Sequence, residues 1–177
     1  MKRKLILFAG LLLLSVFAAQ AQSNSKFDAL SLSEAGQKSY EKLLNAAIFR
    51  IGAVGEFGIT SKEELALHNL LKEKNALEAL ISLAEQATPE GSLYALFGFR
   101  FKDQNLFNSE IEKYKSLPEP LERENAVFEI KIQKGFVLTQ SGCKLIREKR
   151  LQVITQIEAG KYDEAFKLSE REVTVSN

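Results

Sequence analysis

The chain has 177 residues, with 24 basic and 23 acidic side chains and a formal charge of +1 at pH 7. This balance gives no electrostatic case for a nucleic-acid-binding protein, which typically carries a strong basic excess. A single cysteine excludes an internal disulfide, so the fold must be stabilised by packing.

Residues 1–21 have the pattern of a secretory signal peptide. Basic residues 2–4 precede an apolar run from Leu5 to Ala18, and residues 19–21 (Ala-Gln-Ala) form an A-x-A cleavage site. The apolar run has 14 residues, whereas a membrane-spanning helix needs about 20. We therefore expect cleavage after Ala21 and export to the periplasm or the medium.

Cleavage would leave 156 residues, which suits one domain. It would also remove three basic residues, leaving 21 basic against 23 acidic side chains and a formal charge of −2. No second apolar run approaches membrane length, so no membrane span is expected after cleavage. The basic run at residues 144–150 is interpreted as a solvated helix face. Outside the cytoplasm, nucleotide and coenzyme pools are absent, and no cofactor is expected.

Residues 22–32 are polar and are predicted to be a flexible lead-in to a single mainly helical domain at 33–177. A helix is predicted from Ser33, with an apolar stripe running from Tyr40 to Ile51. Three glycines at 52, 55 and 58 then interrupt the pattern. No Lys-Ser/Thr pair follows them and no strand precedes them, so they are interpreted as a loop and not as a phosphate site.

Three helix starts follow at intervals of about 13 residues, and each has its own capping signal. Ser61 with Glu64 forms a capping box, Asn75 begins a second helix, and Thr88 precedes a proline suited to a first helical turn. The segment 93–101 (LYALFGFRF) is apolar on nearly every side and is predicted to be the centre of the core. A further helix is predicted around Leu106 to Tyr114.

After residue 121 the pattern changes to alternation. Phe128, Ile130 and Ile132 alternate with charged residues, Lys134-Gly135 offers a turn, and residues 136–139 resume a β-type composition. This predicts one β-hairpin near residues 127–140, followed by helices at 145–159 and 161–171. The predicted fold is therefore mainly α (α+β): an irregular multi-helix domain with six or seven helices and one hairpin.

His68 is the only histidine, which limits both metal binding and histidine-based catalysis. Glu64 lies four residues earlier on the same helical face, but two ligands do not make a metal site. Together with Lys72, these residues are interpreted as solvated i,i+4 pairs, and no metal site is predicted.

The stretch 139–143 (Thr-Gln-Ser-Gly-Cys) combines small polar residues with a sulfur nucleophile just before a predicted helix. A helix N-terminus lowers the pKa of a thiol and offers N–H donors, as a nucleophile for acyl transfer requires. His68 would have to act as its base, and nothing in the sequence argues for their contact. We expect Cys143 to be a buried structural thiol.

The run from Thr88 to Phe99 (TPEGSLYALFGF), then Asp103 and Phe107, and finally residues 139–143 resemble a pattern found in uncharacterised exported bacterial proteins. The resemblance covers residues 88–143. It implies no assigned activity and assigns no catalytic residue to this chain.

No complete catalytic, cofactor-binding or metal-binding constellation is present in the sequence. The prediction is an exported, non-catalytic module that binds a protein or an envelope component through a groove between helices. Two alternatives remain open. One is a thiol-dependent hydrolase or transferase that uses Cys143 with His68, and the other is a structural protein of the envelope.

Overall fold

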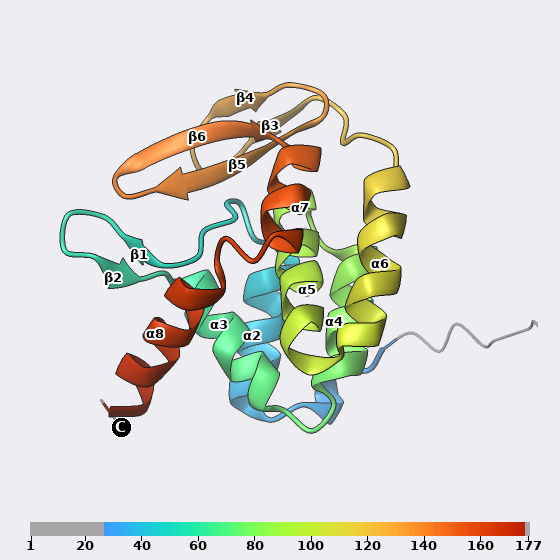
Figure 1. The fold of residues 1–177 in the computed structure, drawn as a ribbon, viewed down its shortest axis with the longest axis vertical. Coiled ribbons are helices and arrows are strands. Elements are labelled where there is room, and N and C mark those ends of the chain that lie inside the picture. Colours follow the sequence, from blue (N-terminus) through green and yellow to red (C-terminus); the bar gives the residue numbers. More distant parts are fainter. Residues whose placement is uncertain (1–26, 176–177) are drawn as a thin grey trace, which may run out of the picture.

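The computed structural model describes residues 27–175, with side chains from residues 27–170. This region contains seven α-helices and three two-stranded antiparallel sheets, which is the mainly helical α+β fold that the sequence predicts. Figure 1 shows the helices α2 to α6 packed together, with the hairpins gathered at one end of them. The predicted signal peptide lies outside the described residues. The helices are α2 (Glu34–Leu44), α3 (Lys62–Lys72), α4 (Ala76–Gln86), α5 (Pro89–Lys102), α6 (Gln104–Ser116), α7 (Arg150–Glu158) and α8 (Asp163–Val175). The strands are β1 (Ala53–Val54), β2 (Ile59–Thr60), β3 (Arg123–Asn125), β4 (Ile130–Ile132), β5 (Phe136–Ser141) and β6 (Lys144–Lys149).

Side-chain caps start four helices at positions where the sequence carries a capping residue. In each case an oxygen accepts the N–H of the residue three positions further on, which satisfies a donor that has no partner within the helix. Asn75 was also predicted to cap a helix, and α4 does begin after it, but its side chain makes no capping hydrogen bond. The capping residues are Ser33, Ser61, Thr88 and Asp103.

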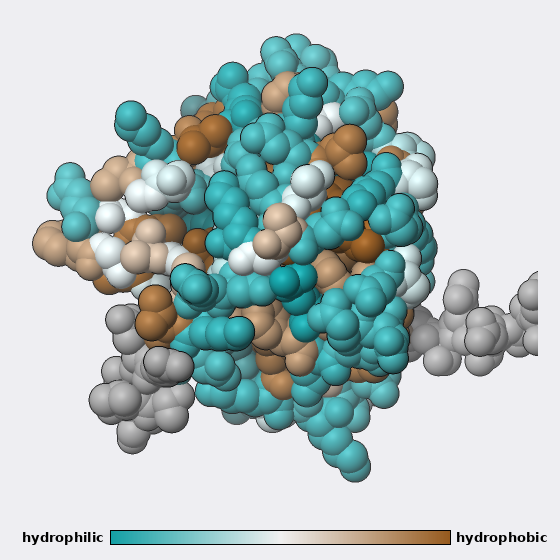
Figure 2. All heavy atoms as spheres, viewed as in Figure 1, coloured by the Kyte–Doolittle hydropathy of each residue, from teal (hydrophilic) through white to brown (hydrophobic). Residues whose placement is uncertain are grey.

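Helix α5 is the centre of the core, as predicted. Leu93, Leu96, Phe97 and Phe99 are completely buried, because α5 contacts five other helices and strand β5. In the same view as Figure 1, Figure 2 shows a mainly hydrophilic surface over the helices. The backbone of the first turn of α5 also packs directly against the backbone at the end of α2. A Cβ atom on Gly91 would lie 2.3 Å from the Leu43 carbonyl oxygen, so only glycine fits this crossing.

Residues 27–32, the described part of the predicted lead-in 22–32, contact the domain, and residues 22–26 lie outside the described residues. A 3₁₀ turn, η2 (Ala29–Ser31), precedes Leu32, which is buried in the core. The Phe27 ring lies 5.4 Å from the Tyr40 ring of α2. Phe27, Ala29 and Leu32 therefore pack on the domain, because their apolar side chains have a surface to bury against.

Helix α2 ends at Leu44, whereas the apolar stripe predicts a helix continuing to Ile51. Residues 46–54 instead run beside β5 in parallel, with bridges from Phe49 to Thr139 and from Val54 to Gly142. The Arg50 amide donates to the hydroxyl of Tyr94 in α5 (2.9 Å). This segment buries its apolar side chains in extended form, so the helical spacing of those residues was misleading.

The prediction of a single hairpin near 127–140 is wrong about which strands pair with each other. The turn at Lys134-Gly135 exists, but it joins β4 to β5 while each strand pairs elsewhere. Strand β4 pairs with β3, and β5 pairs with β6. The sharp turn between β5 and β6 is at Gly142-Cys143, where Gly142 has φ +55°. Glycine adopts that φ without strain, which makes this the tight hairpin turn.

Residues 144–149 form strand β6, although the sequence predicts a helix from 145. Helix α7 begins at Arg150, whose N–H donates to the Gly135 carbonyl (2.9 Å). The pairing of β6 with β5 overrides the local helical pattern because it satisfies one backbone edge of β5. No helix in the described part of the chain is both long and apolar enough to cross a membrane.

Candidate functional site

His68 is buried, so its interpretation as part of a solvated row of charges is wrong. The side chain is 2% exposed, and its ring stacks on that of Phe166 in α8 with the centroids 3.9 Å apart. Its Nε2 lies 2.9 Å from the Ser169 hydroxyl. Burial lowers the pKa of His68 to about 4, so the ring is neutral at pH 7.

Glu64 is also buried, on the same face of α3 as His68. Its N–H is capped by the Ser61 hydroxyl (3.0 Å), as the capping box predicts. One carboxylate oxygen accepts the Gly52 amide (2.8 Å) and the other accepts the Ser169 hydroxyl (2.5 Å). Glu64, His68 and Ser169 therefore form a buried hydrogen-bonded cluster that holds α8 against α3. The Ser169 hydroxyl is buried in this cluster and is not an exposed nucleophile.

Cys143 is exposed, which overturns the prediction of a buried thiol. It occupies the turn between β5 and β6 and does not precede a helix, so no helix N-terminus acts on it. No contact in the described region joins Cys143 to His68, whose Nε2 lies against Ser169. The structure therefore does not bring the two candidate catalytic residues together.

The exposure of Cys143 predicts its alkylation behaviour. An iodoacetamide reaction followed by mass spectrometry should label Cys143 at a similar rate in the native and the urea-unfolded protein, since access is not limiting. His68→Ala should leave the native rate unchanged. A native rate that falls clearly in the His68→Ala protein would contradict this prediction and favour a thiol-histidine pair.

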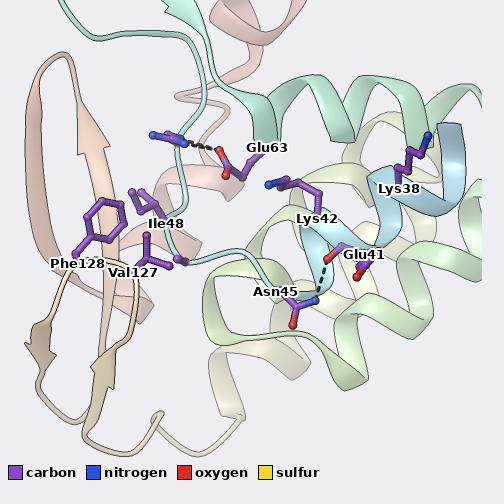
Figure 3. A pocket seen from close by; sticks show the side chains of 10 residues that line it. Lys38, Glu41, Lys42, Asn45, Ile48, Glu63, Val127 and Phe128 are labelled. Carbon is purple, nitrogen blue, oxygen red and sulfur yellow. Dashed lines mark hydrogen bonds and ion pairs between the residues drawn. The ribbon is translucent and has the colours of Figure 1, made fainter.

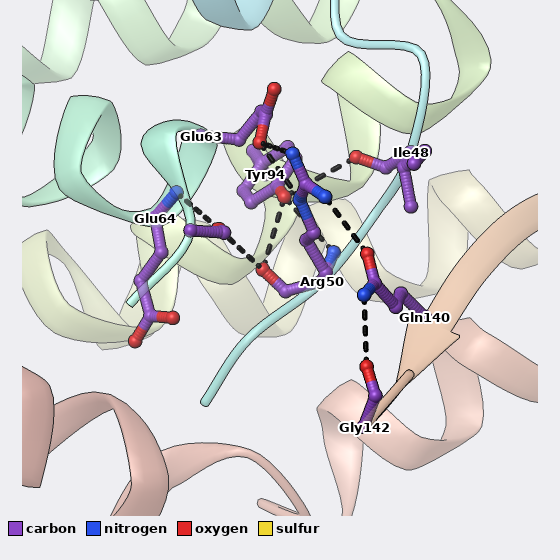
Figure 4. A network of polar contacts seen from close by, with 8 residues as sticks. Ile48, Arg50, Glu63, Glu64, Tyr94, Gln140 and Gly142 are labelled. Atoms are coloured by element: carbon purple, nitrogen blue, oxygen red, sulfur yellow. Dashed lines mark hydrogen bonds and ion pairs between the residues drawn. The ribbon is translucent and has the colours of Figure 1, made fainter. Parts of the chain in front are cut away.

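A polar network that the sequence analysis missed is built around Arg50 (Figure 4). Its guanidinium donates twice to Glu63 of α3 (2.6 and 2.9 Å) and once to Gln140 of β5 (2.8 Å). The Tyr94 hydroxyl lies within hydrogen-bonding distance of the Ile48 and Arg50 carbonyl oxygens (3.3 and 3.1 Å). Burial raises the pKa of Tyr94 far above its usual value, so it remains a neutral hydrogen-bonding group.

This network fixes one end of an open groove of about 500 Å³ (Figure 3). Helix α2 forms one wall, and the turn between β3 and β4 forms the other. Ile48 lies between the two walls. Val127 and Phe128 project from the turn, and Val127 is 69% exposed. The remaining lining residues are Lys38, Glu41, Lys42, Asn45, Ala47, Arg50 and Glu63.

The groove offers both an apolar surface and positive charge. Arg50 and Glu63 form an ion pair and neutralise one another. Lys38 bonds only to the exposed Glu34, a kind of surface pair that contributes little. The Lys42 side chain points across the groove mouth toward Glu63, and no hydrogen bond or ion pair joins it to a described residue. With Glu41 as the remaining acid, the lining has an excess of one positive charge.

Residues 139–142 of the predicted site line another, smaller cavity of about 240 Å³, but Cys143 does not line it. Its polar groups are already bonded to one another: the Thr139 hydroxyl donates to Glu148 (2.5 Å), and Gln156 donates to the other oxygen of that carboxylate (3.2 Å). The Tyr162 hydroxyl in turn donates to Gln156 (2.5 Å). These bonds leave few free donors or acceptors, so the larger groove is the better candidate site.

Within residues 27–175, no three histidine, cysteine, aspartate or glutamate side chains gather as metal ligands would. The candidate functional site is therefore the groove between α2 and the β3–β4 turn. Comparison with protein-family models, with curated proteins and with solved structures finds no match to this chain.

Proposed function

We propose that this protein is an exported, non-catalytic binding module that holds a segment of an envelope protein in the groove between α2 and the β3–β4 turn. The observation that carries the proposal is the exposed apolar lip, Val127 and Phe128, beside a lysine without an ion-pair partner in the described region. Exposed apolar side chains beside a concave surface mark interaction sites. Export itself rests on the pattern of residues 1–21.

The groove chemistry indicates what such a segment would carry. An apolar side chain would pack against Val127 and Phe128, where it would cover surface that now faces water. An acidic group beside it would meet Lys42 and, after displacing the weak surface pair with Glu34, Lys38. The proposed location differs from the groove between helices that the sequence favours, since a hairpin supplies one wall here.

A site-specific crosslinking experiment tests this proposal. A photo-crosslinking amino acid replaces Val127 in one protein and Leu30 in a control, because Leu30 is 77% exposed and lies outside the groove. Each protein is exported in a bacterial host and irradiated, and adducts are identified by mass spectrometry. We expect a discrete envelope-protein adduct from position 127 and none from position 30.

A charge-reversed groove provides the second arm of the test. Lys42→Glu together with Phe128→Asp should abolish the adduct from position 127 while leaving the unfolding midpoint nearly unchanged, because both side chains lie at the surface. Adducts that persist in this variant, or that form equally from position 30, would refute binding in the groove.

A further inference from the structure

Strand β6 is paired along one edge only. Its six residues form a ladder with β5, and no bridge joins its other edge to any residue in the described region. An open strand edge presents unpaired N–H and C=O groups, which are a template for another strand. Figure 1 places β6 at the surface of the hairpin end.

The hydrogen bonds of β5 identify which groups of β6 face outward. The Leu138 carbonyl accepts the Phe49 amide (2.8 Å), and the Leu138 amide donates to Glu90 (2.8 Å), so the Leu138 backbone points away from β6. Leu138 is opposite Arg147 in the register. Hydrogen-bonded and non-bonded pairs alternate along an antiparallel ladder. The N–H and C=O groups of Arg147 and of Leu145 therefore point to the open edge.

The side chains around this edge are exposed and basic. Leu145 and Ile146 are each 38% exposed, and Lys144, Arg147 and Lys149 are all exposed. None of these three cations forms an ion pair with a described residue. The one acid on the strand, Glu148, already accepts hydrogen bonds from Thr139 and Gln156.

We propose that the open edge of β6 binds an extended acidic segment of a partner protein as an added antiparallel or parallel strand. Main-chain hydrogen bonds to Leu145 and Arg147 supply the binding, and the basic side chains select the charge of the partner. Pairing with a second copy would bring two basic strands together, which disfavours a homodimer at this edge. An acidic side chain at every second residue would face Arg147 and Lys149, which share one face of β6.

This inference goes beyond the groove, because neither Leu145 nor Arg147 lines it. The two proposals therefore fail separately. A ligand in the groove perturbs α2 and the β3–β4 turn, whereas a strand at the edge perturbs alternate amides of β6.

Amide hydrogen exchange with a synthetic peptide tests the inference. The probe is an eight-residue peptide in which glutamate alternates with valine and threonine, and the control peptide carries lysine in place of glutamate. At a free peptide concentration of about ten times Kd, exchange of a protected amide slows by about tenfold. We expect this slowing for Leu145 and Arg147, and little change for Ile146 and Glu148, whose amides already bond to β5.

Three variants separate the backbone contribution from the side-chain contribution. Leu145→Pro removes an outward N–H and should abolish binding of the peptide. Strand β6 should still form, since proline is tolerated on edge strands where the N–H faces solvent. Leu145→Ala retains the N–H and should bind as the unmodified protein does. Arg147→Ala should weaken binding and reduce its salt dependence.

Four results would overturn the proposal. The first is no binding of the acidic peptide at about 1 mM, the weak end of measurable affinity. The second is equal binding of the lysine peptide, and the third is slowing at neighbouring amides without alternation. Chemical-shift changes confined to Lys42 and Phe128 would place the peptide in the groove and would also overturn binding at the edge.

Discussion

Phe97→Ala is expected to lower the free energy of unfolding by about 3–5 kcal/mol, because it removes a completely buried aromatic ring from the centre of the core. The cavity would open inside a cluster of four rings, three of which belong to other segments of the chain, and these segments cannot all close around it. Urea denaturation followed by circular dichroism measures the change. The rings nearest Phe97 belong to Phe49, Phe101, Tyr162 and Phe166.

The matched control is Phe57→Ala, the same chemical change at the tip of the β1–β2 hairpin. Phe57 is 91% exposed, so its removal should alter the free energy of unfolding by less than about 0.5 kcal/mol. A Phe97→Ala protein whose urea midpoint matches that of the Phe57→Ala protein would show that α5 is not the centre of the core.

The helical framework could be predicted because its signals are local. A cap such as Ser61 or Thr88 acts on the N–H three residues further on, and the sequence carries both partners. The burial of α5 follows from an apolar composition on all its faces. Neither inference needs to know which distant segment comes next to the helix.

Strand pairing depends on distant partners, and here the prediction was wrong. A turn joins β4 to β5, but β4 pairs with β3, which precedes it, and β5 pairs with β6, which follows it. Alternation within β4 cannot distinguish these partners, because a register is decided by which face is buried. Gly142, just before Cys143, is the available signal for the tight turn, but beside the thiol it is interpreted as part of a nucleophile site.

The buried polar residues were missed for a different reason. Glu64 and His68 share a helical face with Leu67, which is completely buried, so this spacing could have placed them inside. Their charges were instead assigned to the surface because ionisable side chains are rarely buried. Glu90 has the same relation to Leu93 and Tyr94, both of which are buried.

The largest electrostatic effect is expected from Arg123→Ala. Glu90, at the start of α5, is 2% exposed and forms an ion pair with Arg123 of β3. The same carboxylate oxygen accepts the Leu138 amide of β5 (2.8 Å), so this buried pair joins both hairpins to the helical core. Removing the cation would leave the carboxylate buried without a counter-charge, which typically costs about 3–5 kcal/mol.

A surface pair on the neighbouring strand provides the control. Lys131 of β4 lies 3.5 Å from Glu122, and both side chains are exposed. Lys131→Ala removes one positive charge, as Arg123→Ala does, but should change the free energy of unfolding by less than about 1 kcal/mol. A similar loss in the two variants would show that the Glu90 pair is not effectively buried.

The pH dependence gives the sharper test of the Arg123→Ala protein. Burial raises the pKa of Glu90 above its ordinary value, against the lowering effects of the Leu138 amide and Arg123. A carboxyl group with a raised pKa in the folded state binds its proton more tightly there than in the unfolded chain, so its contribution to stability is lost as pH rises through the folded pKa.

Without Arg123 the pKa of Glu90 should rise further. The deficit of Arg123→Ala should therefore be largest at pH 7 and should narrow as the pH falls and Glu90 becomes protonated. Glu90→Gln in the Arg123→Ala background should remove most of this pH dependence. If Arg123→Ala lowered the free energy of unfolding equally at pH 7 and at acid pH, the assignment of a buried, charged Glu90 would be contradicted.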